Sequence, residues 1–154
     1  VTLEPSSNDA AVFQHSLEHV TDPIASLGQV RDALLPGGIV AIIVPNFDSW
    51  QRKRFGSRWF HLDLPRHRLH FTPAAMAAAF ERAGLESVSI GTTSSAVGLP
   101  GTFQYAIFGR CLFRRGLPLM IATGLAYLVS PLSALIDRIA GGGDFLWAVA
   151  RRRQ

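Results

Sequence analysis

The chain has 154 residues, of which 48% are hydrophobic and 17% are charged. This length and composition suit one globular domain with a buried core, and they exclude an intrinsically disordered chain. The single cysteine, Cys111, excludes a disulfide framework and a cysteine-based zinc site, and it favours a reducing compartment. No secretory leader is recognisable at the start of the sequence, so we expect a cytoplasmic protein.

Basic residues outnumber acidic residues, and the formal net charge is +4. Six basic residues fall in one stretch, at Arg52, Lys53, Arg54, Arg58, Arg66 and Arg68. Such a stretch permits contact with phosphate, nucleic acid or anionic lipid, whereas the simpler interpretation is a solvated surface that keeps the chain soluble.

The first half of the sequence predicts a strand, a helix and a second strand. Residues 10–13 form a short apolar run typical of a buried parallel strand. Asp22 is a favourable N-cap, and Pro23 suits the first helical position. One apolar helical face follows at Ile24, Leu27, Val30 and Leu34. We expect residues 36–38 to end this helix and residues 39–44 to form the strongest strand of the chain.

The second half begins with an irregular segment, residues 45–70, that is rich in aromatic and basic side chains. Thr72 and Pro73 predict the start of a second helix by the same capping logic. Residues 85–90 and 145–150 then read as strands, which makes the chain an α/β protein.

Residues 117–136 contain no charged side chain and are long enough to span a membrane. We expect Pro131 to kink this stretch or to split it into two short helices. If the strands at 85–90 and 145–150 share one sheet, a single membrane crossing between them is excluded. We therefore expect a helical hairpin that forms a lid or dips into a bilayer surface, while a buried core hairpin is an equal alternative. The predicted insertion covers residues 94–140, and the core covers residues 1–93 and 141–154.

The stretch from Asp9 to Val20, followed by Asp22-Pro23, resembles the fourth strand and the next loop of the class I S-adenosylmethionine-dependent methyltransferases. The similar subgroup includes the ubiquinone-biosynthesis O-methyltransferases and many bacterial enzymes. Further similar segments are Leu35 to Gly38 with Val44-Pro45-Asn46, Trp59 to Asp63 with Pro65-Arg66-His67, His70 to Pro73, Ala83-Gly84-Leu85, and Gly143 to Ala150. The resemblance implies the second half of a Rossmann-like sheet, in the spatial order 10–13, 39–44, 145–150 and 85–90, with 145–150 antiparallel.

The family's glycine-rich first loop and its ribose-binding acid are not found in this sequence. Together with the absence of an initiator methionine before Val1, this leads us to expect a truncated chain that is inactive alone. The resemblance implies S-adenosylmethionine as cofactor, with Gln14 and His15 facing its methionine end. Glu4 is a weaker match to the loop that contacts adenine.

His15, Glu18 and His19 are the predicted catalytic residues, because methyl transfer to oxygen needs a base for the acceptor's proton. No metal is assigned. The pattern His15-x-x-Glu18-His19 is nevertheless similar to a metal-holding Glu-x-x-Glu-His pattern of the ubiquinone-type enzymes, and its donors could ligate a divalent cation. The structural alternative is that Glu18 and His19 cap or orient the next helix, with Glu18 bonding to the backbone.

A second polar cluster contains His61, Asp63, Arg66, His67 and His70. We expect His61, Arg66 and His67 to bind substrate, with the Arg66 guanidinium binding a carboxylate or phosphate. The structural alternative is a surface loop whose basic side chains stack on Trp59 and Phe60.

The leading functional hypothesis is methyl transfer, preferably to oxygen, on a small acceptor that is apolar or lipid-like because residues 117–136 are apolar. One alternative is a nucleic-acid-binding module that stacks bases on aromatic side chains of the basic segment, although no recognised nucleic-acid motif supports it. Another alternative is an inactive scaffold that self-associates through an exposed sheet edge.

Overall fold

The computed structural model describes residues 4–110 and 116–154, so Cys111, Arg114 and Arg115 lie outside the described residues. The chain folds into two compact units. The first, here called the sheet unit, comprises Val1–Asn46, Pro65–Gly91 and Leu146–Gln154, and the second, the helical unit, comprises Phe47–Leu64 and Thr92–Phe145. The helical unit therefore holds residues 47–64 in addition to the predicted insertion. Trp50 Nε1 and Gln51 Nε2 donate hydrogen bonds to the Asp137 carboxylate and hold this segment in the unit.

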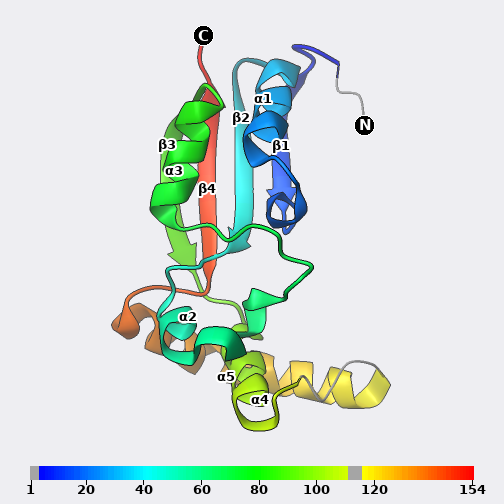
Figure 1. Ribbon diagram of the computed structural model, residues 1–154, viewed down its shortest axis with the longest axis vertical. Coiled ribbons are helices and arrows are strands. Elements are labelled where there is room, and N and C mark those ends of the chain that lie inside the picture. Colours follow the sequence, from blue (N-terminus) through cyan, green and yellow to red (C-terminus); the bar gives the residue numbers. More distant parts are fainter. Residues whose placement is uncertain (1–3, 111–115) are drawn as a thin grey trace. The chain divides into compact units, whose positions relative to one another are not determined.

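The sheet has four strands in the order β1 (Asn8–Gln14), β2 (Leu34–Pro45), β4 (Phe145–Arg152) and β3 (Leu85–Thr93). Strands β1 and β2 are parallel, and β4 runs antiparallel to its neighbours β2 and β3 (Figure 1). The predicted strand order and the antiparallel last strand are confirmed. This arrangement places the C-terminal ends of β1 and β2 at the same edge of the sheet.

Two capped helices cover the sheet in this unit, α1 (Pro23–Ala33) and α3 (Pro73–Arg82) (Figure 1). The Asp22 carboxylate accepts a hydrogen bond from the amide of Ala25, and the Thr72 hydroxyl accepts one from Ala75. Both caps were predicted. The predicted end of the first helix is wrong, because α1 stops at Ala33 and residues 36–38 are part of β2.

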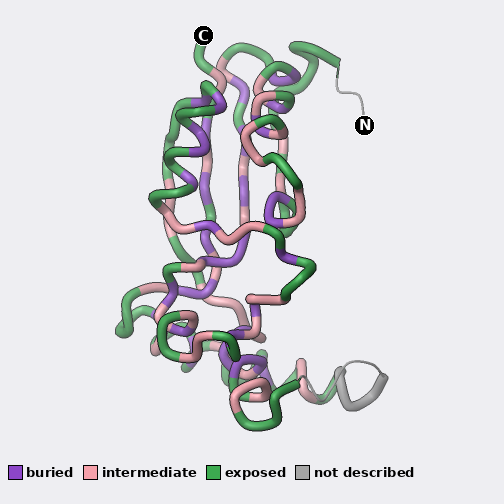
Figure 2. The backbone as a smooth tube through the Cα atoms, viewed as in Figure 1, coloured by how far each residue is buried: buried purple, intermediate pink, exposed green. Residues whose placement is uncertain are grey.

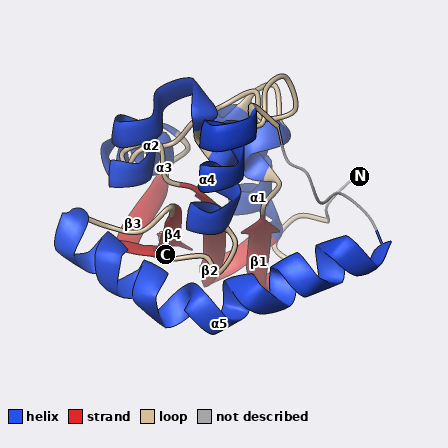
Figure 3. Ribbon diagram, turned by 90° about the horizontal axis from the view of Figure 1, so that it is seen from below, coloured by secondary structure: helices blue, strands red, loops and turns tan. Residues whose placement is uncertain are grey.

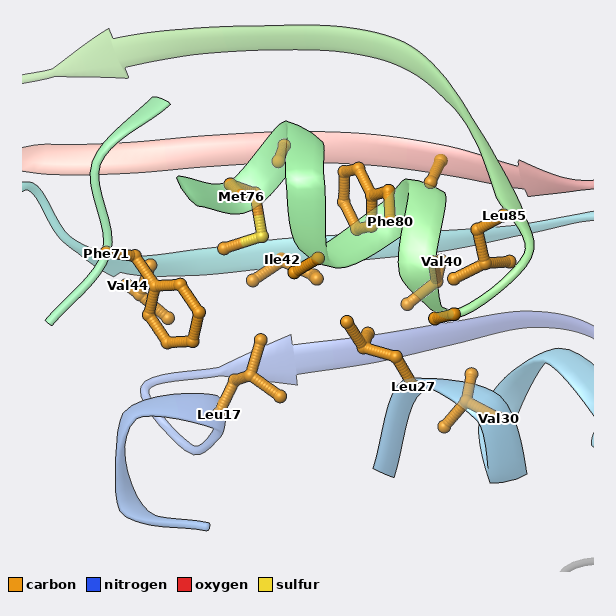
Figure 4. Close-up of a cluster of buried hydrophobic side chains, with 14 of the residues drawn as sticks. Leu17, Leu27, Val30, Val40, Ile42, Val44, Phe71, Met76, Phe80 and Leu85 are labelled. Atoms are coloured by element: carbon orange, nitrogen blue, oxygen red, sulfur yellow. The ribbon is translucent and has the colours of Figure 1, made fainter. Parts of the chain in front are cut away.

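The core of the sheet unit lies between these helices and the sheet (Figure 4). Alternate residues of β2 point into it, and the centre of the sheet is the most buried part of the unit (Figure 2). Fully buried core side chains come from η1 (Leu17–His19), both helices and the strands β2, β3 and β4: Leu17, Leu27, Met76, Phe80, Leu34, Val40, Val44, Leu85 and Leu146. Helix caps and apolar periodicity thus produce one conventional buried core.

The prediction that residues 10–13 form a buried strand is wrong. Strand β1 is an edge strand with β2 as its neighbour, and the side chain of Val12 is 70% exposed. Apolar runs predict burial only when something covers both faces, and within the described residues no element covers the outer face of β1. Val88 of β3, at the other edge, is also exposed.

The helical unit contains α2 (Trp50–Phe55), two short 3₁₀ turns at Gly56–Arg58 and Phe60–Leu62, α4 (Gly98–Phe108) and α5 (Gly116–Ala140). Pro131 was expected to kink the uncharged stretch or to split it. It does not split the stretch, since α5 is one helix with Pro131 inside it, and the helix bends along its length (Figure 3). Residues Met120–Ala140 are long and apolar enough to cross a membrane, and only 17% of the most apolar window is buried. The alternative of a buried core hairpin is therefore also wrong.

Candidate functional site

The polar residues after β1 begin with a strained turn at His15. Strand β1 ends at Gln14, and the amide of His15 still donates a hydrogen bond to the carbonyl of Ile43 on β2. His15 then takes a φ of 49°, in the left-handed region that few residues other than glycine adopt. Strain of this kind costs about 1–3 kcal/mol and is concentrated at functional sites. The turn leaves the imidazole of His15 accessible at the strand end.

Glu18 lies one turn further on, in η1, and its side chain is only 1% exposed. Neither carboxylate oxygen accepts a hydrogen bond from the described residues. The nearest imidazole nitrogens are His15 Nδ1 at 3.7 Å and His67 Nε2 at 3.9 Å from Oε1, both beyond hydrogen-bond distance. A buried carboxylate without donors is unfavourable unless something else, such as a ligand or an ion, fills the gap.

The backbone of η1 holds the segment that carries His67. The carbonyl of Glu18 accepts hydrogen bonds from the amides of Arg68 and Leu69, at 2.9 and 3.1 Å. The ring of His67 is thereby brought to 4.9 Å from the ring of His19, centroid to centroid. Two segments almost fifty residues apart in the sequence therefore meet at one polar cluster.

His19 has a defined tautomer when it is neutral. Its Nδ1 lies 2.8 Å from the carbonyl oxygen of Arg66, and a carbonyl can only accept, so Nδ1 carries the proton. Nε2 is then left as a lone-pair donor. A backbone carbonyl on one ring nitrogen is the usual second partner of a histidine that binds metal through the other.

The strand-end cluster, defined here as His15, Glu18, His19 and His67, has two chemical capabilities. Donor atoms of Glu18, His19 and His67 lie within 4.8 Å of one another, close enough for one ion to bridge them. Two imidazoles and a carboxylate suit a transition metal better than magnesium. The accessible imidazole of His15 beside a buried carboxylate also suits proton transfer.

The cluster unites three predicted catalytic residues, His15, Glu18 and His19, and adds His67 from the predicted substrate group. Gln14 lies beside it at the end of β1. Glu4 does not, because it precedes the start of β1 and so lies at the opposite end of that strand. Arg66 has an exposed side chain and contributes its carbonyl to His19.

The structural alternative for Glu18 and His19 as caps is wrong. Asp22 caps α1, and the Glu18 side chain accepts nothing from the backbone of the described residues. The Glu18 side chain is therefore buried without capping a helix.

His61, the remaining predicted substrate residue, belongs to the helical unit and is buried there. Its Nε2 donates to Asp144 Oδ2 at 2.7 Å, and Ser95 donates to the same carboxylate through both Oγ and its amide, each at 2.6 Å. Ser95 Oγ lies 3.5 Å from His61 Nε2 and donates to Asp144, so the histidine does not activate the serine as a nucleophile. This cluster fastens the loop at residue 61 to the start of β4.

One of the aromatic residues that would stack bases is not accessible. Trp59 is buried, and Trp50 is held by a hydrogen bond from its indole N–H to Asp137. Base stacking requires an accessible ring face, so the nucleic-acid alternative loses Trp59 as a stacking residue.

Sequence reasoning missed Asp144, Ser95 and Asp137, and it assigned His67 to another group. Asp144 follows a run of three glycines that read as a flexible break, and Asp137 ends an otherwise apolar helix. Gly98 indicates the buried position of Asp144, because a Cβ at Gly98 would lie 1.7 Å from Asp144 Oδ2. This relation is visible only in the folded structure.

A protein family described as "Methyltransferase domain" matches residues 5–90, which is more than half of the chain. No curated protein matches the sequence.

Solved structures of similar fold cover almost the whole chain. A S-adenosylmethionine-dependent methyltransferase from Thermotoga maritima, a possible histamine N-methyltransferase, has 14% identity and a TM-score of 0.62, covering 99% of this chain and 60% of that one. The [4+2]-cyclase SpnF has 15% identity and a TM-score of 0.56, covering 99% and 52%. Phosphoethanolamine N-methyltransferase 2 from Haemonchus contortus, bound to S-adenosylmethionine, has 16% identity and a TM-score of 0.55, covering 99% and 35%.

At these identities the likeness establishes the fold, and the cyclase illustrates that one fold serves different reactions. The chain spans 60% or less of the length of these three structures.

Proposed function

Since the chain belongs to the methyltransferase-domain family, we propose that it supplies the strand-end half of an active site for S-adenosylmethionine-dependent methyl transfer. The observation that carries the proposal is the strand-end cluster, with its strained His15 and its buried Glu18 that lacks a hydrogen-bond donor. In open α/β sheets, ligands bind beyond the carboxyl ends of the parallel strands, which is where this cluster lies.

Bound S-adenosylmethionine would supply an electrophilic methyl group. His15 is the proposed base, because its ring is accessible and its backbone fixes it at the end of β1. It accepts the proton that the acceptor hydroxyl loses as the oxygen takes the methyl group. Glu18, 3.7 Å from His15, would stabilise the imidazolium that results.

The proposed roles of Gln14 and His67 follow from their positions at the end of β1 and in the strand-end cluster. Gln14 and His15 would face the methionine end of the cofactor, and His67 would border the acceptor. A divalent cation held by Glu18, His19 and His67 is compatible with the same site, because it would fill the gap around the Glu18 carboxylate.

We further propose a small acceptor that is apolar or lipid-like, methylation on oxygen, and a cytoplasmic protein peripheral to the membrane. The exposed apolar surface of α5 supports this choice of acceptor. An exposed β1 edge would also permit self-association.

The test uses the full open reading frame that encodes this chain. Calorimetry should detect S-adenosylmethionine binding, and S-adenosylhomocysteine release should depend on an added phenolic or polyprenyl acceptor. His15→Ala should lower kcat, measured at a saturating concentration of the donor, by about 100- to 10,000-fold, the usual contribution of a general base.

The matched control is Glu86→Ala, which removes an exposed titratable side chain of the same unit, on β3, and should leave kcat unchanged. Failure of the full protein to bind S-adenosylmethionine contradicts the proposal. Equal losses in the two variants would contradict the role of His15.

A further inference from the structure

Helix α5 presents its apolar side chains outward. Its exposed positions include Leu125, Leu128, Leu132, Leu135 and Ile139, and Leu128 is 77% exposed. Its buried positions, Ala126, Ser133 and Asp137, are small or polar. In a helix of a water-soluble domain the large apolar residues face the core. Small residues toward the protein and large apolar residues away from it are the pattern of a helix that faces lipid.

The second helix of this surface repeats the pattern. On α4, Phe103, Ile107 and Phe108 are exposed, whereas the buried residues are Gly98, Gly101, Thr102 and one large apolar residue, Leu99. An apolar groove of about 320 Å³ lies between α4 and α5, with Leu99, Phe103, Leu132 and Ile136 in its walls. Two neighbouring helices therefore expose one apolar face, here called the α4–α5 face. A face this apolar marks an interaction site.

The charge of the chain is concentrated in the same unit. The helical unit has eight arginine and lysine residues against four aspartates, a net charge of +4, whereas the sheet unit has seven of each sign. Two of the four aspartates, Asp137 and Asp144, are fully buried with hydrogen-bond partners. Among the described residues, the exposed Arg110 follows the end of α4 and the exposed Arg138 lies in the last turn of α5, so positive charge borders the apolar face. This complements an anionic lipid surface.

The connections of α4 and α5 decide between a helix that crosses a bilayer and one that lies on it. Strands β3 and β4, which flank this segment, are neighbours in one sheet, so the chain must enter and leave on the same side. A crossing by α5 would need a second crossing to return. Helix α4 has 11 residues, about 16 Å, against a hydrocarbon core of about 30 Å. The pair can lie in the interface but cannot form two spans.

We propose that the α4–α5 face docks on an anionic membrane surface, with α5 lying in the plane of the interface. The apolar side chains enter the acyl region, and the arginines remain at the level of the lipid headgroups. The inference does not rest on methyl transfer, because it uses only burial and charge in the helical unit.

The experiment is vesicle flotation of the chain, without S-adenosylmethionine. One vesicle type is phosphatidylcholine alone, and the other contains 30% phosphatidylglycerol. We expect flotation with the anionic vesicles, with a binding constant at least about tenfold higher than for neutral vesicles at 0.1 M salt and a smaller preference at 0.5 M. Leu128→Glu with Leu132→Glu should lower binding by about 100-fold or more, because both side chains are exposed and neither substitution disturbs a core.

The matched control is Leu64→Glu, at a similarly exposed leucine of the same unit outside both helices, and it should change binding less than threefold. Circular dichroism verifies that all variants remain folded. Absence of flotation with both vesicle types overturns the proposal. So does a discrete dimer in lipid-free solution that the double variant dissociates, since a second copy would then be the occupant. Equal binding to neutral and anionic vesicles overturns the commitment to an anionic surface.

Discussion

The sheet unit buries one carboxylate almost completely, Glu18, and the helical unit buries two, Asp137 and Asp144. Glu18 and Asp144 differ most in their hydrogen bonding. In the helical unit, Asp144 is fully buried and accepts three hydrogen bonds from Ser95 and His61. In the sheet unit, Glu18 is equally buried and accepts none from the described residues. A satisfied buried carboxylate fastens the structure around it, whereas an unsatisfied one reduces stability unless a ligand completes it. We infer a structural role for Asp144 and a functional role for Glu18.

The largest effect is expected for Asp144→Ala. This change leaves the buried donors of His61 and Ser95 unpaired, and we expect the free energy of unfolding to fall by about 3–5 kcal/mol. Urea unfolding followed by tryptophan fluorescence measures it, since Trp50 and Trp59 both lie in the helical unit. The control is Asp48→Ala, an exposed aspartate beside Lys53, with an expected loss under about 1 kcal/mol. Similar losses in both variants would remove the structural role of Asp144.

The next effect concerns a ligand for Glu18. If an ion completes its carboxylate, Zn²⁺ at 100 times its dissociation constant should stabilise the sheet unit by about 2.7 kcal/mol. The measurement is urea unfolding followed by far-ultraviolet circular dichroism, with and without chelator. Glu18→Gln should abolish the stabilisation. An equal effect of Zn²⁺ on the variant would contradict a metal at this position.

A smaller effect is expected for Gly98→Ala. The added methyl group would lie 1.7 Å from Asp144 Oδ2, which its three donors hold in place, and we expect a loss of about 1–3 kcal/mol. Gly124→Ala is the control, because nothing lies within 4 Å of a Cβ there and alanine favours a helix by about 1 kcal/mol. If Gly98→Ala were as well tolerated as Gly124→Ala, the Asp144 cluster would not be rigid.

Local features of the fold were predictable because their causes lie within a few residues. The caps at Asp22 and Thr72 use side chains three positions before the amides they bind, and both were predicted. Burial was less predictable, because it depends on what covers a strand or helix. The apolar run of β1 therefore predicted an interior position that the structure contradicts, and the apolar run of α5 left open a buried core hairpin that the structure also contradicts.

The same distinction applies to the site. His15, Glu18 and His19 fall within five residues, so the sequence alone indicated that they share one place. His67 reaches this group only because the Glu18 carbonyl accepts hydrogen bonds from the amides of Arg68 and Leu69, which follow His67 in the chain. Ser95 and Asp144 are 49 residues apart, and no spacing in the sequence predicts their contact.

The most direct test compares Glu18→Gln with Asp144→Asn by urea unfolding in the absence of metal and cofactor. We predict that Asp144→Asn loses several kcal/mol, whereas Glu18→Gln loses less than about 1 kcal/mol or becomes more stable, because the Glu18 carboxylate accepts no hydrogen bond from the described residues that the amide would lose. A loss for Glu18→Gln as large as that for Asp144→Asn would contradict the functional role of the strand-end carboxylate.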